Sequence, residues 1–288
     1  MIKWIVTVLV LLAWPVWADS LTVELGYRYY VIDLPAQPAN APIFLALHGG
    51  GGSPAQFSRD SALSAGANAT GYAVIYPAGV GRFRLLTWNA GYCCSYAQKT
   101  GSDDAGFLAA VIADASTRFG LNGDRVYLTG KSNGAIMAET FAALHPDHIR
   151  AVAAVSGTMD VRNVAPQRAV PLLIIHGTAD RHVQYNGGAG PDALVDTNFA
   201  PVDAVIAALE AVNAPLVYSM KTIDPVDDGM SVQQTDYTDD KGSVQIRLLA
   251  VQGGGHVWPG GGRLIRYGQS TKDINANDQI LQFFALHP

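Results

Sequence analysis

The chain has 288 residues, of which 49% are hydrophobic and 15% are charged. This composition excludes an intrinsically disordered chain and fits a packed core of the size found in one large domain. With 19 basic and 24 acidic residues the net charge is −5, so we expect no nucleic-acid partner.

The N-terminus predicts a secretory signal peptide over residues 1–18. Lys3 precedes an apolar run that ends in the small residue Ala18, and no cysteine follows to take a lipid. A membrane anchor is the alternative, but the apolar stretch has only fifteen residues and contains Pro15. Cleavage would leave 18 basic and 24 acidic residues, a net charge of −6. We expect a secreted or periplasmic protein with no stable membrane anchor after cleavage.

The first half of the mature chain alternates strand and helix patterns. LTVEL and YRYYVIDL predict a hairpin, and APIFLALHG predicts a strand that is buried on both faces. A helix is expected around Pro54 to Ala67, followed by the strand YAVIYP and a long loop that contains Trp88. A further helix, from about Asp103 to Phe119, carries an apolar stripe and begins with acidic residues.

The second half continues the alternation. The predicted strands are RVYLTG, IRAVAAVSG, PLLIIHG and SVQIRLLAV. The predicted helices are NGAIMAETFAALH, a segment near Pro201 to Val212, and a closing segment from about Ile274 to Leu286. This order predicts an α/β fold with a mostly parallel, doubly wound sheet flanked by helices, in a single domain over residues 19–288. In such sheets ligands bind beyond the carboxyl ends of the strands.

A serine lies at one of these strand ends. Ser132 lies in GKSNG, with Gly130 and Gly134 on either side, at the turn between RVYLTG and the following helix. A five-residue match to G-x-S-x-G is weak by itself, and its bland explanation is a glycine-flanked turn. The strand-turn-helix setting is what a nucleophile elbow requires, because the glycines let strand and helix approach closely. Ser132 is the predicted nucleophile.

The loop after APIFLALHG contains four glycines, Gly49 to Gly52. A flexible turn and a phosphate-binding loop are the alternatives, but neither the Walker spacing nor G-x-G-x-x-G is present. An oxyanion hole uses backbone N–H groups that the acyl group can approach closely. We expect the N–H of Gly50 to form it, with Gly51 as the second choice, together with the N–H of Asn133 after the nucleophile.

The predicted acid is Asp180, in the segment LLIIHGTADRHVQY that ends a buried strand. Most aspartates after strands only cap a turn, and Asp224, Asp227 and Asp228 compete for the role. Those three follow a less clear strand. Asp180 is therefore the first choice.

The predicted base is His256, in the glycine-rich segment AVQGGGHVWPGGG after the last predicted strand. His182 is its only serious rival, and His48 and His176 are expected to bond backbone groups within the site. Ser132, Asp180 and His256 occur in the chain order of α/β-hydrolases. In this scheme His256 takes the Ser132 proton while Asp180 fixes the imidazole tautomer, and no cofactor or metal is needed.

The two cysteines are adjacent, at Cys93 and Cys94. Across a trans peptide their Cα atoms would lie about 3.8 Å apart, so a disulfide between them would be strained. Export would still favour oxidation. A vicinal disulfide and two buried thiols stay open as alternatives, whereas a metal site is disfavoured because no second pair completes it.

Six segments together resemble the secreted polyhydroxybutyrate depolymerase and feruloyl esterase-like family: LHGGGGS, WNAGYCC, DDAGFLAAVI, RVYLTGKSNGAIMA, HGTADRHVQY and GGGHVWPGG. The resemblance implies an α/β-hydrolase fold, hydrolysis of carboxylic esters without a cofactor, and Ser132, Asp180 and His256 in the triad positions. Ala135 departs from the family pattern, in which many relatives have glycine. The resemblance also implies that Trp258 lies beside the acyl site.

Trp88 and Trp258 are in loops expected to frame the site, so we expect both to bind a flat or apolar acyl group. The expected substrate is a small-molecule or oligomeric ester, either of the polyhydroxybutyrate type or a short-chain or feruloyl ester. The sequence shows no separate polymer-binding domain, which disfavours solid polyester. A serine peptidase of the same fold and a non-catalytic secreted binding protein are the other functions considered.

Overall fold

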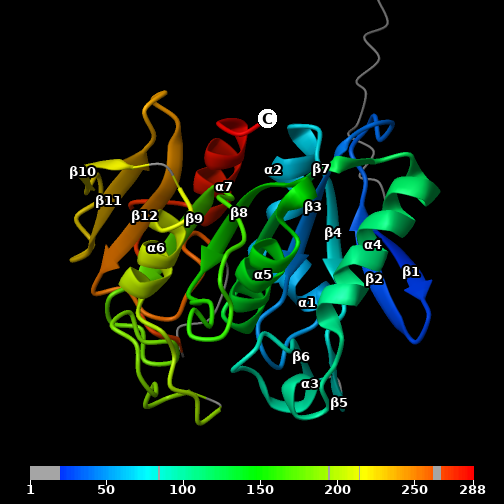
Figure 1. Ribbon diagram of the computed structural model, residues 1–288, viewed down its shortest axis with the longest axis horizontal. Helices are drawn as coiled ribbons and strands as arrows, with labels where there is room; N and C mark the ends of the chain where they lie inside the picture. Colours follow the sequence, from blue (N-terminus) through cyan, green and yellow to red (C-terminus); the bar gives the residue numbers. More distant parts are fainter. Residues whose placement is uncertain (1–19, 84, 194, 214, 262–266) are drawn as a thin grey trace, which may run out of the picture.

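The computed structural model describes residues 20–288 apart from residues 84, 194, 214 and 262–266. The predicted signal peptide lies outside this part of the chain. A ten-stranded sheet runs through the described residues, in the order β1-β2-β4-β3-β7-β8-β9-β12-β11-β10 (Figure 1). Its strands are β1 (Leu21–Leu25), β2 (Arg28–Asp33), β3 (Pro42–Leu47), β4 (Ala73–Pro77), β7 (Asn122–Lys131), β8 (Ile149–Val155), β9 (Leu172–Gly177), β10 (Val217–Ile223), β11 (Ser231–Thr238) and β12 (Val244–Gln252).

The centre of the sheet is parallel. Neighbouring strands from β4 to β12 run in the same direction, whereas β1, β2, β11 and β10 add antiparallel pairs at the two edges. The central strands are long apolar runs because both of their faces are buried. The parallel, doubly wound sheet predicted from the sequence is therefore confirmed.

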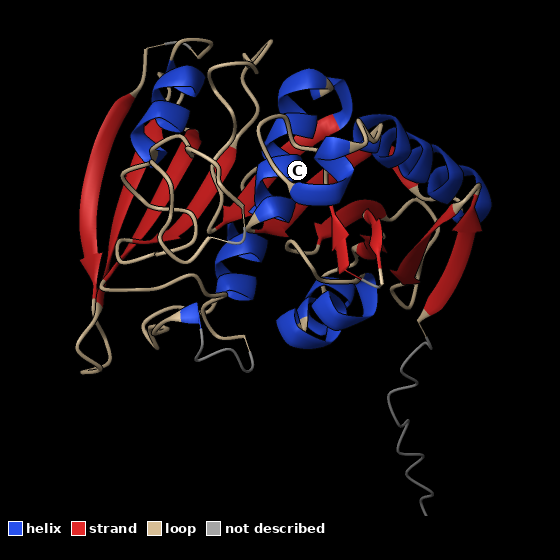
Figure 2. Ribbon diagram, turned by 90° about the horizontal axis from the view of Figure 1, so that it is seen from below, coloured by secondary structure: helices blue, strands red, loops and turns tan. Residues whose placement is uncertain are grey.

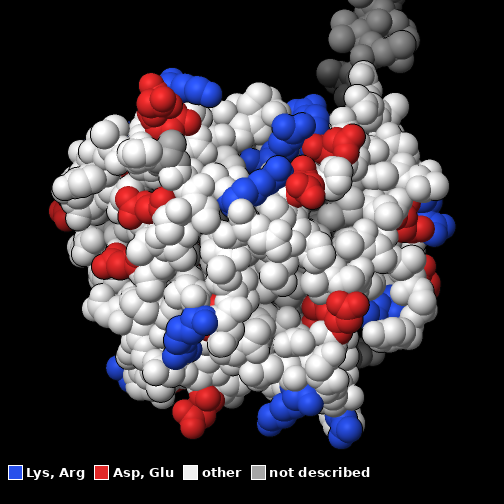
Figure 3. Space-filling model, in the orientation of Figure 1, with Lys and Arg blue, Asp and Glu red and all other residues white. Residues whose placement is uncertain are grey.

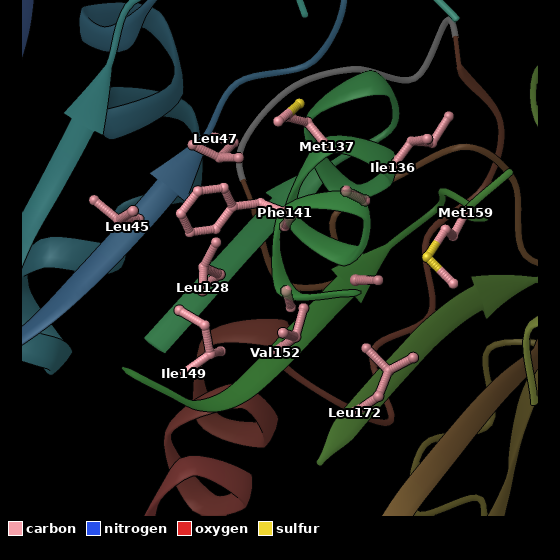
Figure 4. Close-up of a cluster of buried hydrophobic side chains, with 14 of the residues drawn as sticks. Leu45, Leu47, Leu128, Ile136, Met137, Phe141, Ile149, Val152, Met159 and Leu172 are labelled. Carbon is pink, nitrogen blue, oxygen red and sulfur yellow. The ribbon is translucent and has the colours of Figure 1, made fainter. Parts of the chain in front are cut away.

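Helices cover both faces of the sheet (Figure 2). The helices are α1 (Pro54–Ser61), α2 (Leu63–Ala69), α3 (Ser95–Lys99), α4 (Asp104–Phe119), α5 (Asn133–Leu144), α6 (Val202–Glu210) and α7 (Ala276–Ala285), with a 3-10 turn, η1, over Pro146–His148. One core cluster lies under α4, α5 and α6, and the other under α1, α2 and α7. In the first cluster, Ile136, Met137 and Phe141 of α5 pack against side chains of β3, β7 and β8 (Figure 4).

Three local features differ from the sequence expectation. The helix predicted around Pro54 to Ala67 is two helices, because Ala62 adopts a left-handed conformation with φ 50° and ψ 30°. The long loop after β4 contains a hairpin of β5 (Val80–Arg82) and β6 (Leu85–Thr87), followed by the short helix α3. The less clear strand before Asp224 is β10, and β11 was not among the predicted strands.

The edge strand β10 is exposed over six of its seven residues and hydrogen-bonds to β11. Val217, Tyr218 and Met220 are among the most exposed apolar side chains of the described chain. On the face drawn in Figure 3, charged side chains occur in small groups separated by wide uncharged areas. In the part of the chain that the structure describes, no helix is long and apolar enough to cross a membrane.

Candidate active site

Ser132 occupies a sharp turn between β7 and α5. Its backbone has φ 56° and ψ −126°, a left-handed conformation that costs a residue other than glycine about 1–3 kcal/mol. A Cβ atom at Gly134 would collide with the carbonyl oxygens of Leu47 and His48, and one at Gly130 would collide with the backbone of Gly134. The two glycines therefore let α5 start directly above β3 and β7, which presents Ser132 at the carboxyl edge of the sheet.

The departure at Ala135 is accommodated locally. Ala135 is fully buried, and a Cβ atom at Gly157 would lie 2.6 Å from the Ala135 Cβ and 2.7 Å from the Ser132 carbonyl oxygen. The missing side chain at Gly157 thus provides the space that the Ala135 methyl group fills. The alanine leaves the turn at Ser132 intact.

Asp180 and His256 meet although 76 residues separate them. Asp180 follows β9 and His256 follows β12, and these two strands are parallel neighbours. His256 Nδ1 lies 2.8 Å from Asp180 Oδ2, while Asp180 Oδ1 accepts the backbone N–H groups of His182 and Val183 at 2.8 and 3.0 Å. Because the Asp180 carboxylate can only accept a hydrogen bond, His256 Nδ1 must donate it. The proton of the neutral imidazole is therefore on Nδ1 and the lone pair is on Nε2.

The environment favours an ionised Asp180 and a neutral His256. Burial of the His256 ring lowers its pKa to about 4, although the hydrogen bond and the charge of Asp180 act in the opposite direction. Burial alone would raise the pKa of Asp180, but the hydrogen bond and the charge of His256, with help from His176, bring that pKa below its usual value. His256 is therefore available as a base at neutral pH.

The rival acids and the rival base lie elsewhere or are oriented differently. Asp228 accepts backbone N–H groups from Met230 and Lys272, so it stabilises a loop. Asp227 lines the cavity, and Asp224 makes no hydrogen bond to His256. His182 stacks on the His256 ring with centroids 4.8 Å apart and an interplanar angle of 23°.

The donor atoms of Asp180, His182 and His256 lie within 4.8 Å of one another, close enough for a metal site. However, the two imidazole rings are stacked, so their in-plane lone pairs run in nearly parallel planes and do not converge on one point. Both oxygens of Asp180 already accept hydrogen bonds. The geometry fits an acid–base pair better than a set of metal ligands.

The glycine loop after β3 lies next to the start of α5. A Cβ atom at Gly49 would lie 3.6 Å from the Ser132 Cβ, and one at Gly50 would lie 3.7 Å from the Asn133 Cβ. The N–H of Gly51 donates to the carbonyl of Leu86 on the β5–β6 hairpin at 2.8 Å, so it is engaged elsewhere. Of the two glycines considered for the oxyanion hole, Gly50 keeps an N–H without a backbone acceptor among the described residues.

His48 holds this glycine loop in place. The N–H of Gly79 donates to His48 Nε2 at 3.0 Å, so the ring proton is on Nδ1, which donates to the Gly49 carbonyl at 2.9 Å. Burial lowers the pKa of His48 to about 4, so the ring stays neutral. The expected backbone-bonding role of His48 agrees with this geometry, and His176 similarly bonds the carbonyl of Val183 at 2.8 Å.

Trp88 does not frame the site, contrary to the expectation from its place in a loop. Its side chain is fully buried, and its indole N–H donates to the His48 carbonyl at 2.8 Å. Its backbone N–H donates to Asn133 Oδ1 at 2.7 Å, and its carbonyl accepts from Asn133 Nδ2 at 3.0 Å. Trp88 therefore acts as a brace between the glycine loop and α5.

A buried ion pair, which the sequence did not reveal, anchors the segment that follows Trp88. Arg28 on β2 lies 2.7 Å from Asp104, the first residue of α4, with both side chains almost fully buried. The other oxygen of Asp104 accepts the backbone N–H of Asn89 at 2.7 Å. The only sequence signal was the acidic start of the helix, which gave no indication of Arg28 as the partner.

Ser132, Asn133 and His256 open into one cavity of about 1120 Å³. Trp258 and Phe57 form one part of its wall, with their rings 5.4 Å apart in an edge-to-face arrangement. Apolar side chains form another part: Ile136, Val183, Val195 and Phe199. The position of Trp258 agrees with the expectation that it borders the site.

The cysteine pair also lines this cavity. The peptide between Cys93 and Cys94 is cis, so their Cα atoms lie 3.0 Å apart rather than at the trans distance expected above, and the structure places their sulfur atoms in contact. Asn133 Nδ2 lies 3.9 Å from Cys93 Sγ. The cysteines thus lie next to the hydrogen bonds between Asn133 and the Trp88 backbone.

Comparisons with known proteins agree with this geometry. The chain is 29% identical over 265 residues to a protein named putative esterase NocK from Nocardia uniformis subsp. tsuyamanensis, covering 86% of the chain and 75% of NocK. It is 34% identical over 131 residues to feruloyl esterase B of Talaromyces stipitatus, covering 46% of the chain but only 35% of that protein. The solved acetyl xylan esterase from Aspergillus awamori superposes with a TM-score of 0.62 at 17% identity, covering 93% of this chain and all of that one.

The structural likeness confirms the predicted α/β-hydrolase fold. Residues 25–169, half of the chain, match the family described as esterase PHB depolymerase, where PHB is polyhydroxybutyrate. This match confirms the resemblance seen in the sequence segments. The chain therefore belongs to the esterase PHB depolymerase family and is a carboxylic ester hydrolase.

Proposed function

We propose that Ser132, His256 and Asp180 form a catalytic triad that hydrolyses soluble carboxylic esters through an acyl-enzyme. The observation that carries this proposal is the 2.8 Å hydrogen bond between His256 Nδ1 and Asp180 Oδ2 beside a cavity that Ser132 also lines. This bond leaves Nε2 of His256 as the basic nitrogen of the site.

In the first half of the reaction, His256 Nε2 removes the Ser132 proton as Oγ attacks the ester carbonyl carbon. The imidazolium then returns that proton to the departing alkoxide, which leaves as an alcohol. In the second half, His256 activates water to attack the acyl-enzyme, and the acid is released as Ser132 regains its proton. Asp180 stays ionised throughout and stabilises the imidazolium.

The negative oxygen of each tetrahedral intermediate would bind to the N–H groups of Gly50 and Asn133. Their neighbouring backbones and the strained turn at Ser132 support this assignment, since donors that are already in place need no reorganisation during the reaction. Asn133 is buried at the start of α5, so its N–H has no acceptor one turn earlier in the helix.

The cavity walls favour a flat or short apolar acyl group. Trp258, Phe57 and Phe199 offer aromatic surface, and Ile136 lies one helical turn after Ser132. Feruloyl esterase B and the polyhydroxybutyrate depolymerase family bear names that point to aromatic and hydroxybutyryl acyl groups respectively. We infer that the substrates are short-chain or feruloyl esters or soluble hydroxybutyrate oligomers.

A substrate panel with Ser132→Ala tests this proposal. The wild-type protein should hydrolyse short-chain nitrophenyl esters and either methyl ferulate or soluble hydroxybutyrate oligomers, with a chromogenic peptide cleaved more slowly. Ser132→Ala should reduce kcat/KM at least about a thousandfold. Ser116→Ala is the matched control, because Ser116 Oγ bonds the Ile112 carbonyl within α4. A folded Ser132→Ala protein with substantial activity would refute the triad, and faster peptide cleavage would refute the substrate class.

Export and the state of the cysteines belong to the same proposal. We infer that cleavage after Ala18 releases a secreted or periplasmic protein, and that Cys93 and Cys94 form a vicinal disulfide there. The order of Lys3, apolar run and small residue supports export, and the oxidising compartment that export reaches supports the disulfide. N-terminal sequencing of the exported protein should give a first residue of Asp19, which tests cleavage.

The disulfide has its own test. A thiol titration under denaturing conditions should find no free thiol, and two free thiols per chain would exclude the disulfide.

A further inference from the structure

His182 contacts both the acid and the base of the proposed triad, although the reaction uses neither of its nitrogens. Its backbone N–H donates to Asp180 Oδ1 at 2.8 Å, and its ring stacks on His256 with centroids 4.8 Å apart. The Tyr267 ring meets His182 edge-to-face at 5.2 Å and His256 at 6.1 Å. His256 is thus bordered by Asp180 at one edge and by His182 over its ring face.

The two imidazoles differ in their access to water. His256 is 5% exposed, whereas His182 is only half-buried and borders the cavity. His182 Nδ1 is itself buried and has no hydrogen-bond partner among the described residues, so the exposed part of this side chain lies elsewhere on the ring. A proton on His182 therefore costs less solvation energy than one on His256, because water can still reach part of the His182 ring.

Other charged groups surround the stack. Asp180 faces both rings, and the Lys131 ammonium lies 4.9 Å from the Tyr267 ring centroid. Around His182 the exposed Arg181 pairs with Asp192 at 2.7 Å. Burial is the main cause that lowers the pKa of both histidines, and Asp180 raises both while Asp192 raises that of His182. Lys131 lowers both, Arg181 lowers that of His182, and His182 itself lowers that of His256. His182 is thus the ionisable group whose ring stacks directly on His256, and Lys131 adds a second positive charge near the pair.

We propose that His182 is a positioning residue: its ring holds the His256 imidazole against Asp180, and in its protonated form it keeps His256 in the neutral, basic state. As the pH falls, His182 takes up a proton first, and the resulting cation repels a second proton from the ring stacked on it. Activity then persists to a lower pH than an isolated His256–Asp180 pair would allow. This matters for an esterase because every turnover releases an acid.

The inference rests on the proposed triad, and the pH dependence of kcat/KM for 4-nitrophenyl butyrate tests it. His182→Phe keeps a flat ring over His256 but cannot be protonated. We expect its acid limb, normalised to its own plateau, to move up by at least about half a pH unit, which is roughly a threefold relative loss of activity on the limb. Arg118→Gln on α4 is the matched control, and its limb should stay in place because the Arg118 charge is exposed, is paired with Asp114 at 2.7 Å and does not act on either histidine.

An unshifted limb in His182→Phe would overturn the inference, as would an equal shift in Arg118→Gln. Failure of the triad proposal is distinguishable, since it would appear as activity retained in Ser132→Ala. If His182→Phe does not fold, histidine NMR titrations of Ser132→Ala with and without His182→Gln give the same answer without turnover. The His256 pKa should be higher in the double variant, and an unchanged value would overturn the inference.

Discussion

The two sides of Ser132 are built from different kinds of interaction. On the acid–base side, beyond β9 and β12, the ionisable groups Asp180, His182 and His256 hold one another. On the oxyanion side, beyond β3, Asn133 and Trp88 are held by hydrogen bonds between neutral groups. Because of this difference, pH should change the protonation of the acid–base side more than that of the oxyanion side. Substitutions on the two sides should therefore change the pH profile and kcat in different ways.

His48, an ionisable brace of the oxyanion side, stays neutral over a wide pH range. The pKa of His48, lowered to about 4 by burial, lies below the usual value for histidine. A histidine with a depressed pKa in the folded state contributes stability that is complete above its unfolded pKa of about 6.5, and that falls as the pH drops toward 4. The glycine loop should therefore be intact throughout the neutral range.

The largest effect is expected from Asp180→Asn on the acid–base side. The amide cannot accept from His256 as a carboxylate does and favours the wrong imidazole tautomer, so kcat should fall by about a thousandfold to ten thousandfold. Steady-state kinetics with a nitrophenyl ester measure the loss. Asp227→Asn is the control, since Asp227 lines the cavity without bonding His256. A larger loss of activity in Asp227→Asn than in Asp180→Asn would show that Asp180 is not the catalytic acid.

A smaller and pH-independent effect is expected from Asn133→Ala on the oxyanion side. The variant keeps the backbone N–H but loses both side-chain bonds that tie Trp88 to the start of α5. We expect kcat to fall by about tenfold to a hundredfold as the oxyanion donors lose alignment. The acid limb of the pH profile should not move. A shifted limb would show that the two sides are coupled more closely than their separate contacts suggest.

The cavity wall should affect binding more than chemistry. Trp258→Ala removes an aromatic surface next to His256, and we expect KM to rise by about threefold to tenfold. Phe199→Ala, on another part of the wall, provides the comparison with the same substrates. A change in kcat that exceeds the change in KM would show that Trp258 orients the acyl group as well as binding it.

A buried carboxyl group with few partners sharpens the comparison with Asp180. Glu139 on α5 is 5% exposed; neither of its carboxyl oxygens makes a hydrogen bond of good geometry within the described chain, and only the backbone N–H of Met159 acts on it. Burial raises the pKa of Glu139 well above its usual value, whereas Asp180, with its N–H and imidazole partners, has a lowered pKa. The supply of partners, rather than burial alone, therefore decides which carboxyl ionises.

Glu139→Met should give the smallest effect, and on stability alone. An apolar side chain of similar volume removes the poorly partnered polar group, so we expect a gain of about 1–3 kcal/mol. Because the Glu139 pKa is raised in the folded state, wild-type stability is lost as the pH rises above the unfolded pKa. The gain in Tm by calorimetry should be greater at pH 8 than at pH 5. An equal gain at both values would contradict the raised pKa.

The sequence predicted the central sheet because strands buried on both faces are continuous apolar runs. It indicated β10 only weakly, since VYSMKTI is exposed on both faces and carries no such run. The break at Ala62 was also missed, because a left-handed alanine leaves no mark in the sequence.

Within the site, the turn at Ser132 and the strand-end positions of Asp180 and His256 could be predicted, because local pattern fixes them. Their catalytic roles remain predictions. The burial of Trp88 could not be predicted, since it depends on the His48 carbonyl and on Asn133, about forty residues away in the chain. The stacking of His182 on His256 likewise arises only when β9 and β12 become neighbours.

The exposed strand β10 has a consequence for the behaviour of the protein in concentrated solution. A strand at a sheet edge can pair with a strand of another molecule, and Val217, Tyr218 and Met220 would make such pairing favourable. Lys221 lies near the middle of the same strand. Two molecules that paired through β10 would therefore bring their two Lys221 ammonium groups close together. A single lysine thus discourages edge-to-edge aggregation, and its protection should weaken as salt screens the charge.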